Sequence, residues 1–538
     1  MTDAAVGSGH PEAAGPGSAG SAAAGSGAAG SGSAGPGRAG QGTARHGTAG
    51  PGTARQGTAG PGTASPVVQL PSVVAAEHRA AVAALRESYA ALPAGTPVRL
   101  AKSTSNLFRF RDPAPRAPGH RRGKGPGTTA GLDASAFTTV LHVDPAARAA
   151  VVGGMTTYED LADATLKHGL MPLVVPQLKT ITLGGAVTGL GIESTSLRNG
   201  LPHESVTAME ILTGDGRVVT ATAAGEHAEL FRGFPNSYGT LGYALSLTIE
   251  LEPVAPFVHL RHFAYTSPQE CMAAIAQIAV DGSLHGHRAD FVDGTVFGLD
   301  EIYLTVGAYS DVAPWRSDYN GQRIYYQSVR GPREDFLTIR DYLWRWDTDW
   351  FWCSRPFGVQ NPVIRRFWPR RYRRSDVYRS LVAFDRRHGL SDTLNANRGL
   401  PSREAVIQDV EIPVDRGAEF LRFFAADVGM SPVWLCPLRL RSGSPWPLYP
   451  LKPGEVYVNF GFWGTVPLPP GRADGHHNRL VEAEVTALGG HKGLYSTSFY
   501  SEEEFWAAYN GPAYARLKSA YDGGGRLSGL YEKCVRGR

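Results

Sequence analysis

Residues 67–92 are the first segment of the chain with a clear period of apolar positions. These positions follow the spacing of one helix face, at Val74, Ala81, Val82, Leu85 and Tyr89. Pro71 lies near the start of the segment, where a helix tolerates proline. We therefore expect an amphipathic helix that opens the folded part of the protein.

Beyond this helix the pattern changes to short strands and short helices. Thr157 precedes a helical segment with acidic residues in its first turn and Lys167 near its end, as the helix dipole favours. An Asp215-Gly216 turn predicts a β-hairpin over residues 207–220. Further β-type runs occupy residues 97–100, 139–143, 149–152 and 244–251. The mixture predicts an α+β protein.

The first 66 residues lack any such pattern. They consist mainly of Gly, Ala, Ser, Thr and Pro, with an approximate repeat seen at Gly42-Thr43-Ala44-Arg45 and Gly52-Thr53-Ala54-Arg55. Small residues bury too little apolar area to offset the entropy lost on ordering. We expect a disordered tail, which serves either as a tether or as a dispensable extension.

Composition narrows the class of protein and its partners. The 538 residues are 42% hydrophobic, enough for a sizeable core, and a formal charge of +4 is too weak to indicate nucleic-acid binding. Four scattered cysteines without a CxxC spacing predict neither a metal site nor a disulfide framework. No apolar run reaches the roughly 20 residues of a membrane-spanning helix. We expect a cytoplasmic protein, with peripheral membrane contact as an option.

Residues 172–200, PLVVPQLKTITLGGAVTGLGIESTSLRNG, are the most informative stretch of the sequence. Glycines let the backbone approach a ligand closely, and hydroxyl and free N–H groups can bind phosphate or ring carbonyls. A glycine-rich turn between helices is the alternative interpretation. Two further polar loops adjoin strands, at residues 102–106 and 236–242, so three such loops fall within one region of the chain.

The order of these motifs resembles a known family. Four motifs in order are similar to the FAD-binding domain of the p-cresol methylhydroxylase type, shared with vanillyl-alcohol oxidase. They are the polar loop after the first strand, then TLGGAVTGLGIESTSLRNG, then the hairpin LTGDGRVV, and then SYGTLGYALSLTIEL. Within that superfamily, the delta-24-sterol reductase branch is most similar to three further motifs: QDVEIPV, PVWLCPLRL and FYSEEEFWAAYNGPAYARLKSAYD. The likeness runs from about Val98 to the C-terminus.

The resemblance implies a two-lobed FAD-binding domain over residues 67–254, a substrate-covering α/β cap domain over 255–480, and a segment over 481–538 that returns to the flavin domain. It also implies non-covalent FAD, because the first loop lacks the histidine frequent in the superfamily and has no cysteine. The cofactor-binding residues it implies are Lys102, Ser103, Thr104, Ser105, Asn106, Thr182, Gly184, Gly185, Gly189, Gly191, Ile192, Glu193, Ser194, Ser196, Ser237, Gly239, Thr240 and Gly242.

Reduction of a C=C bond needs a proton donor across the substrate from the flavin. Candidate donors are Tyr495, Lys492 and Glu193. Asp409 and Glu411 are further candidates, because period-2 geometry places both on one face of a strand. The alternative for this pair is a strand with one solvated acidic face.

Two clusters in the expected cap bear on the substrate. Large aromatic residues crowd residues 342–352 and suit a polycyclic substrate, a membrane-facing surface or core packing. Arginines alternate with aromatic residues over 365–374, which suits an anionic lipid surface, the extra phosphate of NADPH or a solvated basic face. Pro369 interrupts that run, so an RNA-reading helix is not expected.

The resemblance implies an FAD-dependent reductase of a C=C bond in a sterol-like or isoprenoid side chain, with NADPH as reductant and a lipophilic small molecule as substrate. A flavin oxidase or dehydrogenase of an alcohol or sugar is the second hypothesis. The third is a membrane-associated scaffold that retains the flavin fold without catalysis. Cap side chains set the specificity, so the sequence leaves the natural substrate open.

Overall fold

The computed structural model describes residues 68–101, 107–109, 130–389, 399 and 401–537. All of them fall within one compact unit, Ala64–Arg538. The tail expected over residues 1–66 and the loop Lys102–Asn106 lie outside the described residues. Within the described ranges no helix is both long and apolar enough to cross a bilayer.

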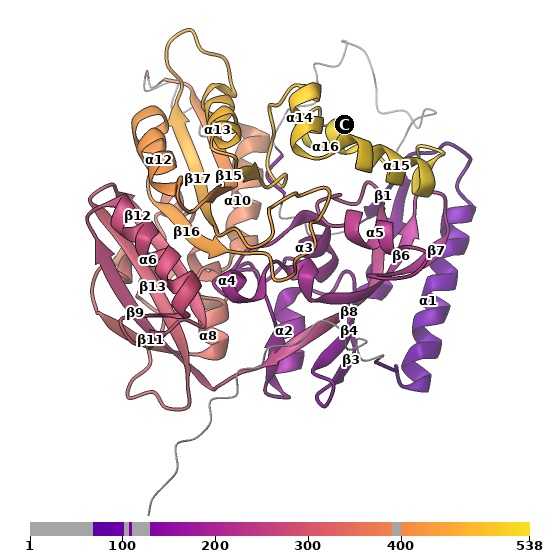
Figure 1. The fold of residues 1–538 in the computed structure, drawn as a ribbon, viewed down its shortest axis with the longest axis horizontal. Coiled ribbons are helices and arrows are strands. Elements are labelled where there is room, and N and C mark those ends of the chain that lie inside the picture. The colour runs from indigo at the N-terminus through magenta and orange to yellow at the C-terminus, as the bar shows by residue number, and fades with distance from the viewer. Residues whose placement is uncertain (1–67, 102–106, 110–129, 390–398, 400, 538) are drawn as a thin grey trace, which may run out of the picture. The chain divides into compact units, whose positions relative to one another are not determined.

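An antiparallel sheet, here the first sheet, dominates the N-terminal half (Figure 1). Its spatial order is β3-β4-β8-β6-β7, and β5 pairs with the far end of β8. The strands are β3 (Val140–Asp144), β4 (Ala149–Gly153), β5 (Leu170–Pro172), β6 (Val206–Thr213), β7 (Val218–Thr222) and β8 (Gly242–Pro253). Short helices connect them: α2 (Tyr158–Leu166), α3 (Leu183–Gly189), α4 (Ser196–Asn199) and α5 (Ala228–Gly233).

Local chemistry explains several element boundaries in this half. The Thr157 side chain accepts a hydrogen bond from the Asp160 amide and begins α2, as predicted. The predicted hairpin forms as β6 and β7, and the predicted first helix forms as α1 (Ser72–Ala90), whose buried face includes Leu85 and Tyr89. A parallel pair, β1 (Val98–Ala101) and β2 (Ala130–Asp133), precedes the sheet.

The second sheet has eight antiparallel strands in the order β14-β9-β13-β12-β16-β17-β15-β18. They are β9 (Phe257–Tyr265), β12 (Phe291–Gly298), β13 (Glu301–Ser310), β14 (Glu334–Thr338), β15 (Arg403–Pro413), β16 (Val433–Leu438), β17 (Tyr457–Pro467) and β18 (His491–Lys492). One face is covered by α6 (Pro268–Asp281), α12 (Gly417–Phe423) and α13 (His476–Ala487) (Figure 1). A small hairpin, β10 (Ser283–Leu284) and β11 (His287–Arg288), follows α6.

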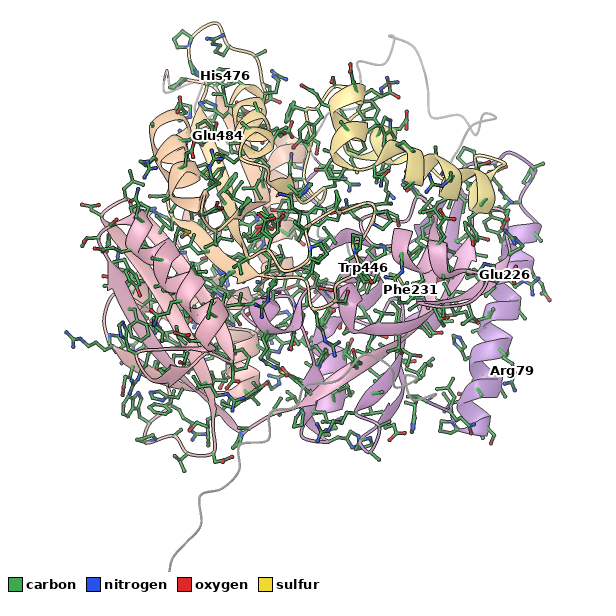
Figure 2. All side chains as sticks on the ribbon, in the orientation of Figure 1. Arg79, Glu226, Phe231, Trp446, His476 and Glu484 are labelled. Carbon is green, nitrogen blue, oxygen red and sulfur yellow. The ribbon has the colours of Figure 1, made fainter. Side chains whose placement is uncertain are left out.

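The segment between β13 and β15 adds helices and turns to the half of the molecule that contains the second sheet. The helices are α7 (Tyr325–Ser328), α8 (Ile339–Leu343), α9 (Pro362–Phe367) and α10 (Ser375–His388). A loop after β16 reaches back to the first half, where the Asn236 side-chain amide donates to the Leu448 carbonyl at 2.6 Å. Figure 2 shows Trp446 of that loop beside Phe231 of α5.

The C-terminal segment packs on the first half of the molecule. It contains α14 (Glu502–Ala508), α15 (Gly511–Asp522) and α16 (Leu530–Cys534). The Lys518 ammonium donates to the Thr240 carbonyl at 2.8 Å, and the Val98 amide donates to the Arg526 carbonyl at 2.8 Å. The predicted α+β fold class is confirmed: two sheets, with helices on their faces, make one structure.

Candidate functional site

A cavity of about 510 Å³ lies between the two halves of the molecule. One wall comes from the glycine-rich segment and nearby loops, including Gly154, Thr180, Thr182, Gly185, Gly189, Gly191, Tyr238, Gly239 and Gly242. The other wall comes from the second sheet and adjoining turns: Trp350, Phe351, Asp409, Trp434, Trp463 and Tyr495. Lys533 of α16 adds a cation to the lining. A polar, glycine-lined wall therefore faces a largely aromatic one.

The glycine wall depends on close packing of backbones. A Cβ on Gly184 would lie 2.6 Å from the Gly154 carbonyl oxygen, so only glycine lets α3 approach the end of β4 this closely. The Thr182 hydroxyl oxygen caps α3 by accepting from the Gly185 amide at 3.2 Å. Gly185 itself faces the cavity. The first turn of α3 thus presents backbone and hydroxyl groups to a ligand.

Many of the predicted cofactor-binding residues line this wall: Thr182, Gly184, Gly185, Gly189, Gly191, Ile192, Gly239 and Gly242. Ser237 and Thr240 do not, because both are fully buried and the Thr240 hydroxyl donates to the Ser237 carbonyl at 2.7 Å. The predicted contacts of Lys102–Asn106 lie outside the described residues.

Glu193, Ser194 and Ser196 were predicted to bind the cofactor, but their side chains lie behind the cavity lining. The Ser194 hydroxyl donates to Glu193 Oε1 at 2.8 Å, and the Ser196 hydroxyl accepts from the Glu193 amide at 3.0 Å. These short local bonds connect the three side chains inside the protein. A contact of their backbone with the cofactor stays a prediction.

Among Tyr495, Lys492 and Glu193, the first three candidate proton donors, only Tyr495 lines the cavity. The Lys492 ammonium is fully buried and donates to Glu482 Oε1 at 2.5 Å and to the Thr497 carbonyl at 2.8 Å. The Glu193 carboxylate bonds the Arg345 guanidinium at 2.9 Å, and Arg345 also pairs with Asp293 at 2.6 Å. Lys492 and Glu193 are therefore held in buried ion pairs away from the cavity lining.

Tyr495 lies in a series of hydrogen bonds on the aromatic wall. The Trp463 indole N–H donates to the Tyr495 hydroxyl oxygen at 2.9 Å, and the Tyr495 side chain lies near the Asp409 carboxyl group. The Asn459 side-chain amide donates to Asp409 Oδ1 at 3.2 Å. Burial raises the pKa of Asp409 to about 7, and burial with the nearby Asp409 charge raises the pKa of Tyr495 well above its usual value.

A solvated acidic face was the alternative for Asp409 and Glu411, and the structure contradicts it. Asp409 lines the cavity, and Glu411 is 1% exposed and accepts a hydrogen bond from the Tyr449 hydroxyl. Burial and the neighbouring Asp409 raise the pKa of Glu411 well above its ordinary range. Glu411 therefore favours the protonated form near neutral pH, and Asp409 is protonated in a substantial fraction of the molecules.

The aromatic residues between 342 and 352 are core and cavity residues, so the membrane-facing alternative is wrong for them. The helix α8 ends at Leu343, and the backbone then turns through short irregular segments that bury every large ring. Trp350 and Phe351 reach the cavity, whereas Trp344 and Trp346 pack in the core. All of these rings can be buried because the residues do not lie on one continuous helix, where some of them would have to face outward.

The arginines between 365 and 374 differ in exposure, and Arg374 is half-buried and paired with Glu159 and Asp376. Arg365 and Arg373 are buried and bonded within the protein, whereas Arg366, Arg370 and Arg371 are exposed. Only the exposed arginines could bind an anionic lipid surface or the extra phosphate of NADPH, and both of these interpretations stay predictions.

Sequence reasoning missed several residues that line the cavity. Trp434 and Trp463 come from adjacent strands β16 and β17, and Lys533 comes from the last helix. Trp434 lies within the motif PVWLCPLRL that carried part of the family resemblance, which was the available signal. For Trp463 and Lys533 no local pattern distinguishes cavity-facing from core-facing positions.

Comparison with known proteins agrees with this site. A family profile described as FAD binding domain matches residues 114–222. The protein is 30% identical over 367 residues to delta(24)-sterol reductase of Rattus norvegicus, a match over 64% of this protein and 66% of that one. It is 28% identical to the Homo sapiens protein, over 70% of its own length and 72% of that one, and 26% identical to the Arabidopsis thaliana protein, over 76% and 77%.

The chain is thus similar to the delta(24)-sterol reductases at modest identity, and part of it matches an FAD-binding domain. Its alignment spans just under two thirds of the length of the rat protein.

The residues present fit an FAD molecule. The glycine wall would leave room for a flat dinucleotide, with Thr180, Thr182 and Thr188 as hydroxyl partners. Non-covalent attachment of the flavin stays a prediction.

Replacing Gly185 by leucine should abolish FAD retention, because the new side chain would fill the cradle and crowd the Thr182 hydroxyl, 2.8 Å from its Cβ. The flavin-to-protein absorbance ratio of the purified variant measures this. Gly524→Ala is the matched control, since its Cβ would meet no atom within 4 Å. A Gly185→Leu protein that holds flavin as tightly as wild type would contradict the assignment.

Proposed function

We propose that the protein reduces a C=C bond in a sterol-like or isoprenoid side chain, with non-covalent FAD as cofactor and NADPH as electron donor. The observation that carries the proposal is the Asp409–Tyr495 pair on an aromatic wall opposite the glycine cradle. Large flat side chains suit a bulky apolar substrate. The names of the relatives agree with a sterol substrate.

Bound FAD would supply hydride chemistry, and the protein must supply the proton. Asp409 is the proposed acid, because a pKa of about 7 leaves a large share of this carboxyl group protonated at neutral pH. Tyr495 remains protonated, since its pKa is raised, and its hydroxyl lies between Asp409 and the Trp463 N–H. We infer that Tyr495 orients the carboxyl proton towards the substrate or passes it on.

The apolar part of the cavity wall would hold the substrate and exclude water. Trp350, Phe351, Trp434 and Trp463 together present four large rings to the cavity. Exclusion of water keeps the Asp409 carboxyl group protonated, because the charged form loses its hydration there. The same rings thus bind the substrate and maintain the acid.

We also propose that the protein is cytoplasmic and contacts a membrane surface through α9. The side chains of Val363, Ile364 and Phe367 are exposed, Phe367 by 78%, and Arg366 and Arg371 lie next to them. Exposed apolar residues with flanking arginines suit an anionic lipid surface, where the rings enter the headgroup region and the guanidinium groups bind phosphate. A lipophilic substrate would be available at such a surface.

The rate of C=C reduction should fall as pH rises through about 7, because Asp409 loses the proton that it must donate. Asp409→Asn should lower the rate by about 10²- to 10³-fold and abolish this pH dependence. Single-turnover mixing of the reduced holoprotein with a sterol whose alkyl tail contains a C=C bond measures both effects.

The exposed Asp427→Asn change is the control for the Asp409 variant. Flavin content should match wild type in both variants, which separates loss of the acid from loss of the cofactor. A rate that instead rises through the same pH range would show Asp409 acting as a base, as an oxidase requires, and would contradict the reductase proposal.

Phe367→Ser should weaken binding to phosphatidylserine-containing vesicles by about tenfold, because the exposed ring is the largest apolar group of the surface. Raising the salt concentration should weaken binding of the wild-type protein, since the arginine contribution is screened. Cosedimentation measures both. Val280→Ser, at an equally exposed position on α6, is the control, and equal loss in both variants would refute the α9 surface.

A further inference from the structure

The turn over residues 347–354 carries two of the aromatic side chains of the cavity. Trp350 stacks on Phe108 with ring centroids 5.5 Å apart, and Phe351 stacks on Trp463 at 4.2 Å. Both rings line the cavity, and each residue is 4% exposed. The position of this turn therefore sets the shape of the aromatic wall.

The backbone of the turn is strained. Trp350 has φ 47° and ψ 56°, and Phe351 has φ 60°, so two consecutive bulky residues adopt the left-handed region. Such residues rarely occupy that region, and they stay there only when the surroundings fix them. Two backbone bonds help: the Trp350 amide donates to the Asp347 carbonyl at 3.0 Å, and the Phe351 amide donates to the Trp346 carbonyl at 2.9 Å.

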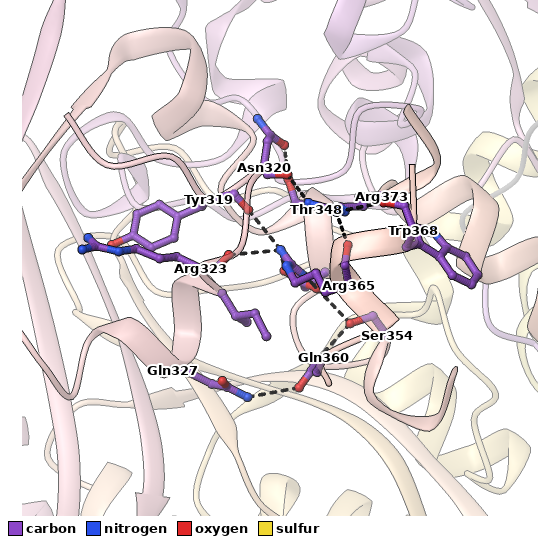
Figure 3. Close-up of polar contacts among 12 residues, drawn as sticks. Tyr319, Asn320, Arg323, Gln327, Thr348, Ser354, Gln360, Arg365, Trp368 and Arg373 are labelled. Carbon is purple, nitrogen blue, oxygen red and sulfur yellow. Dashed lines mark hydrogen bonds and ion pairs between the residues drawn. The ribbon is translucent and has the colours of Figure 1, made fainter. Parts of the chain in front are cut away.

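A buried ion pair anchors the turn from behind. Arg365 of α9 binds both oxygens of the Asp349 carboxylate, at 2.7 Å and 3.0 Å, and is fully buried. The Ser354 hydroxyl donates to Asp349 Oδ1 at 3.0 Å, which ties the end of the turn to its beginning. Figure 3 shows Arg365 at the centre of these contacts.

The other N–H groups of Arg365 reach a separate loop, residues 319–323. They donate to the carbonyls of Gly321 at 2.8 Å, Arg323 at 3.0 Å and Tyr319 at 3.2 Å. Arg373 donates to the same loop and to the Arg365 carbonyl (Figure 3). Arg365 thus connects the turn, α9 and this loop, although it does not line the cavity.

We propose that Arg365 is a positioning residue: through Asp349 it holds Trp350 and Phe351 in their strained positions, and so makes the cavity selective for broad, rigid, polycyclic lipophiles over linear ones. This inference rests on the proposed function. A buried ion pair adds little net stability compared with apolar packing, but its planar two-point geometry fixes position. Lysine keeps the charge and loses that geometry.

The test compares full-length Arg365→Lys and Asp349→Asn with wild type, and uses the exposed Arg422→Lys as control. Dissociation constants for a sterol with an unsaturated alkyl tail and for farnesol, a linear isoprenoid, are measured by tryptophan fluorescence. Near-ultraviolet circular dichroism reports the packing of the aromatic wall and needs no ligand. Flavin content is recorded for every variant.

Arg365→Lys should weaken sterol binding by about tenfold, the equivalent of roughly one good aromatic contact. Farnesol binding should change by less than about twofold, which is a small free-energy change. The near-ultraviolet signal should decrease, flavin content should hold, and Asp349→Asn should behave in the same way. In a Phe351→Ala background the Arg365→Lys effect on sterol binding should largely disappear, because the wall residue that Arg365 positions is absent.

Unchanged sterol affinity and an unchanged near-ultraviolet signal in Arg365→Lys would overturn the proposal. Equal losses for the sterol and farnesol would also overturn it, as would failure of both variants to fold, because the pair would then serve folding alone. Failure of the proposed function is distinct: the wild-type protein itself would then bind neither flavin nor sterol, and the dichroism signal would still decide whether Arg365 positions the wall.

Discussion

The guanidinium group of Arg345 bonds one carboxylate from each half of the molecule. Glu193 lies in the glycine-rich segment, and Asp293 lies in β12 of the second sheet, where the Trp346 indole N–H also donates to it at 2.9 Å. All of these groups are buried, so loss of one partner would leave a charge without compensation at a cost of about 3–5 kcal/mol. The glycine wall and the aromatic wall are thereby held in a fixed relation, and the cavity between them depends on it.

The two walls of the cavity have different proposed roles: one would bind the cofactor, and the other would bind the substrate and exclude water. Close backbone packing at Gly184 leaves room for a dinucleotide on one side, and the rings of the other side keep water away from Asp409. A carboxyl group in such surroundings is a proton donor near neutral pH, whereas the same group in water would be ionised. In the proposed reaction, the apolar character of the wall would set the protonation state of Asp409, so substrate binding and proton donation would share one cause.

Short-range chemistry made much of the fold predictable. The period of residues 67–92, the Thr157 cap and the Asp215-Gly216 turn each act through near neighbours in the sequence, and the corresponding elements formed as expected. The glycines of the cradle were predictable because backbone approach requires them. The partners of the buried charged residues could not be predicted. Lys492 pairs with Glu482, and Glu193 pairs with Arg345 far away in the sequence. Residue type alone therefore does not distinguish a proton donor from a member of an ion pair. Likewise, one arginine cluster contained both exposed residues and the buried Arg365.

The claim on which all of this depends is that the cavity holds a flavin without a covalent bond. The most direct measurement is the visible absorption spectrum of the purified protein, followed by acid denaturation and separation of the precipitate from the supernatant. A yellow protein that releases its entire flavin as free FAD into the supernatant is the predicted result. Colourless protein whose melting temperature does not change when FAD is added would contradict the account.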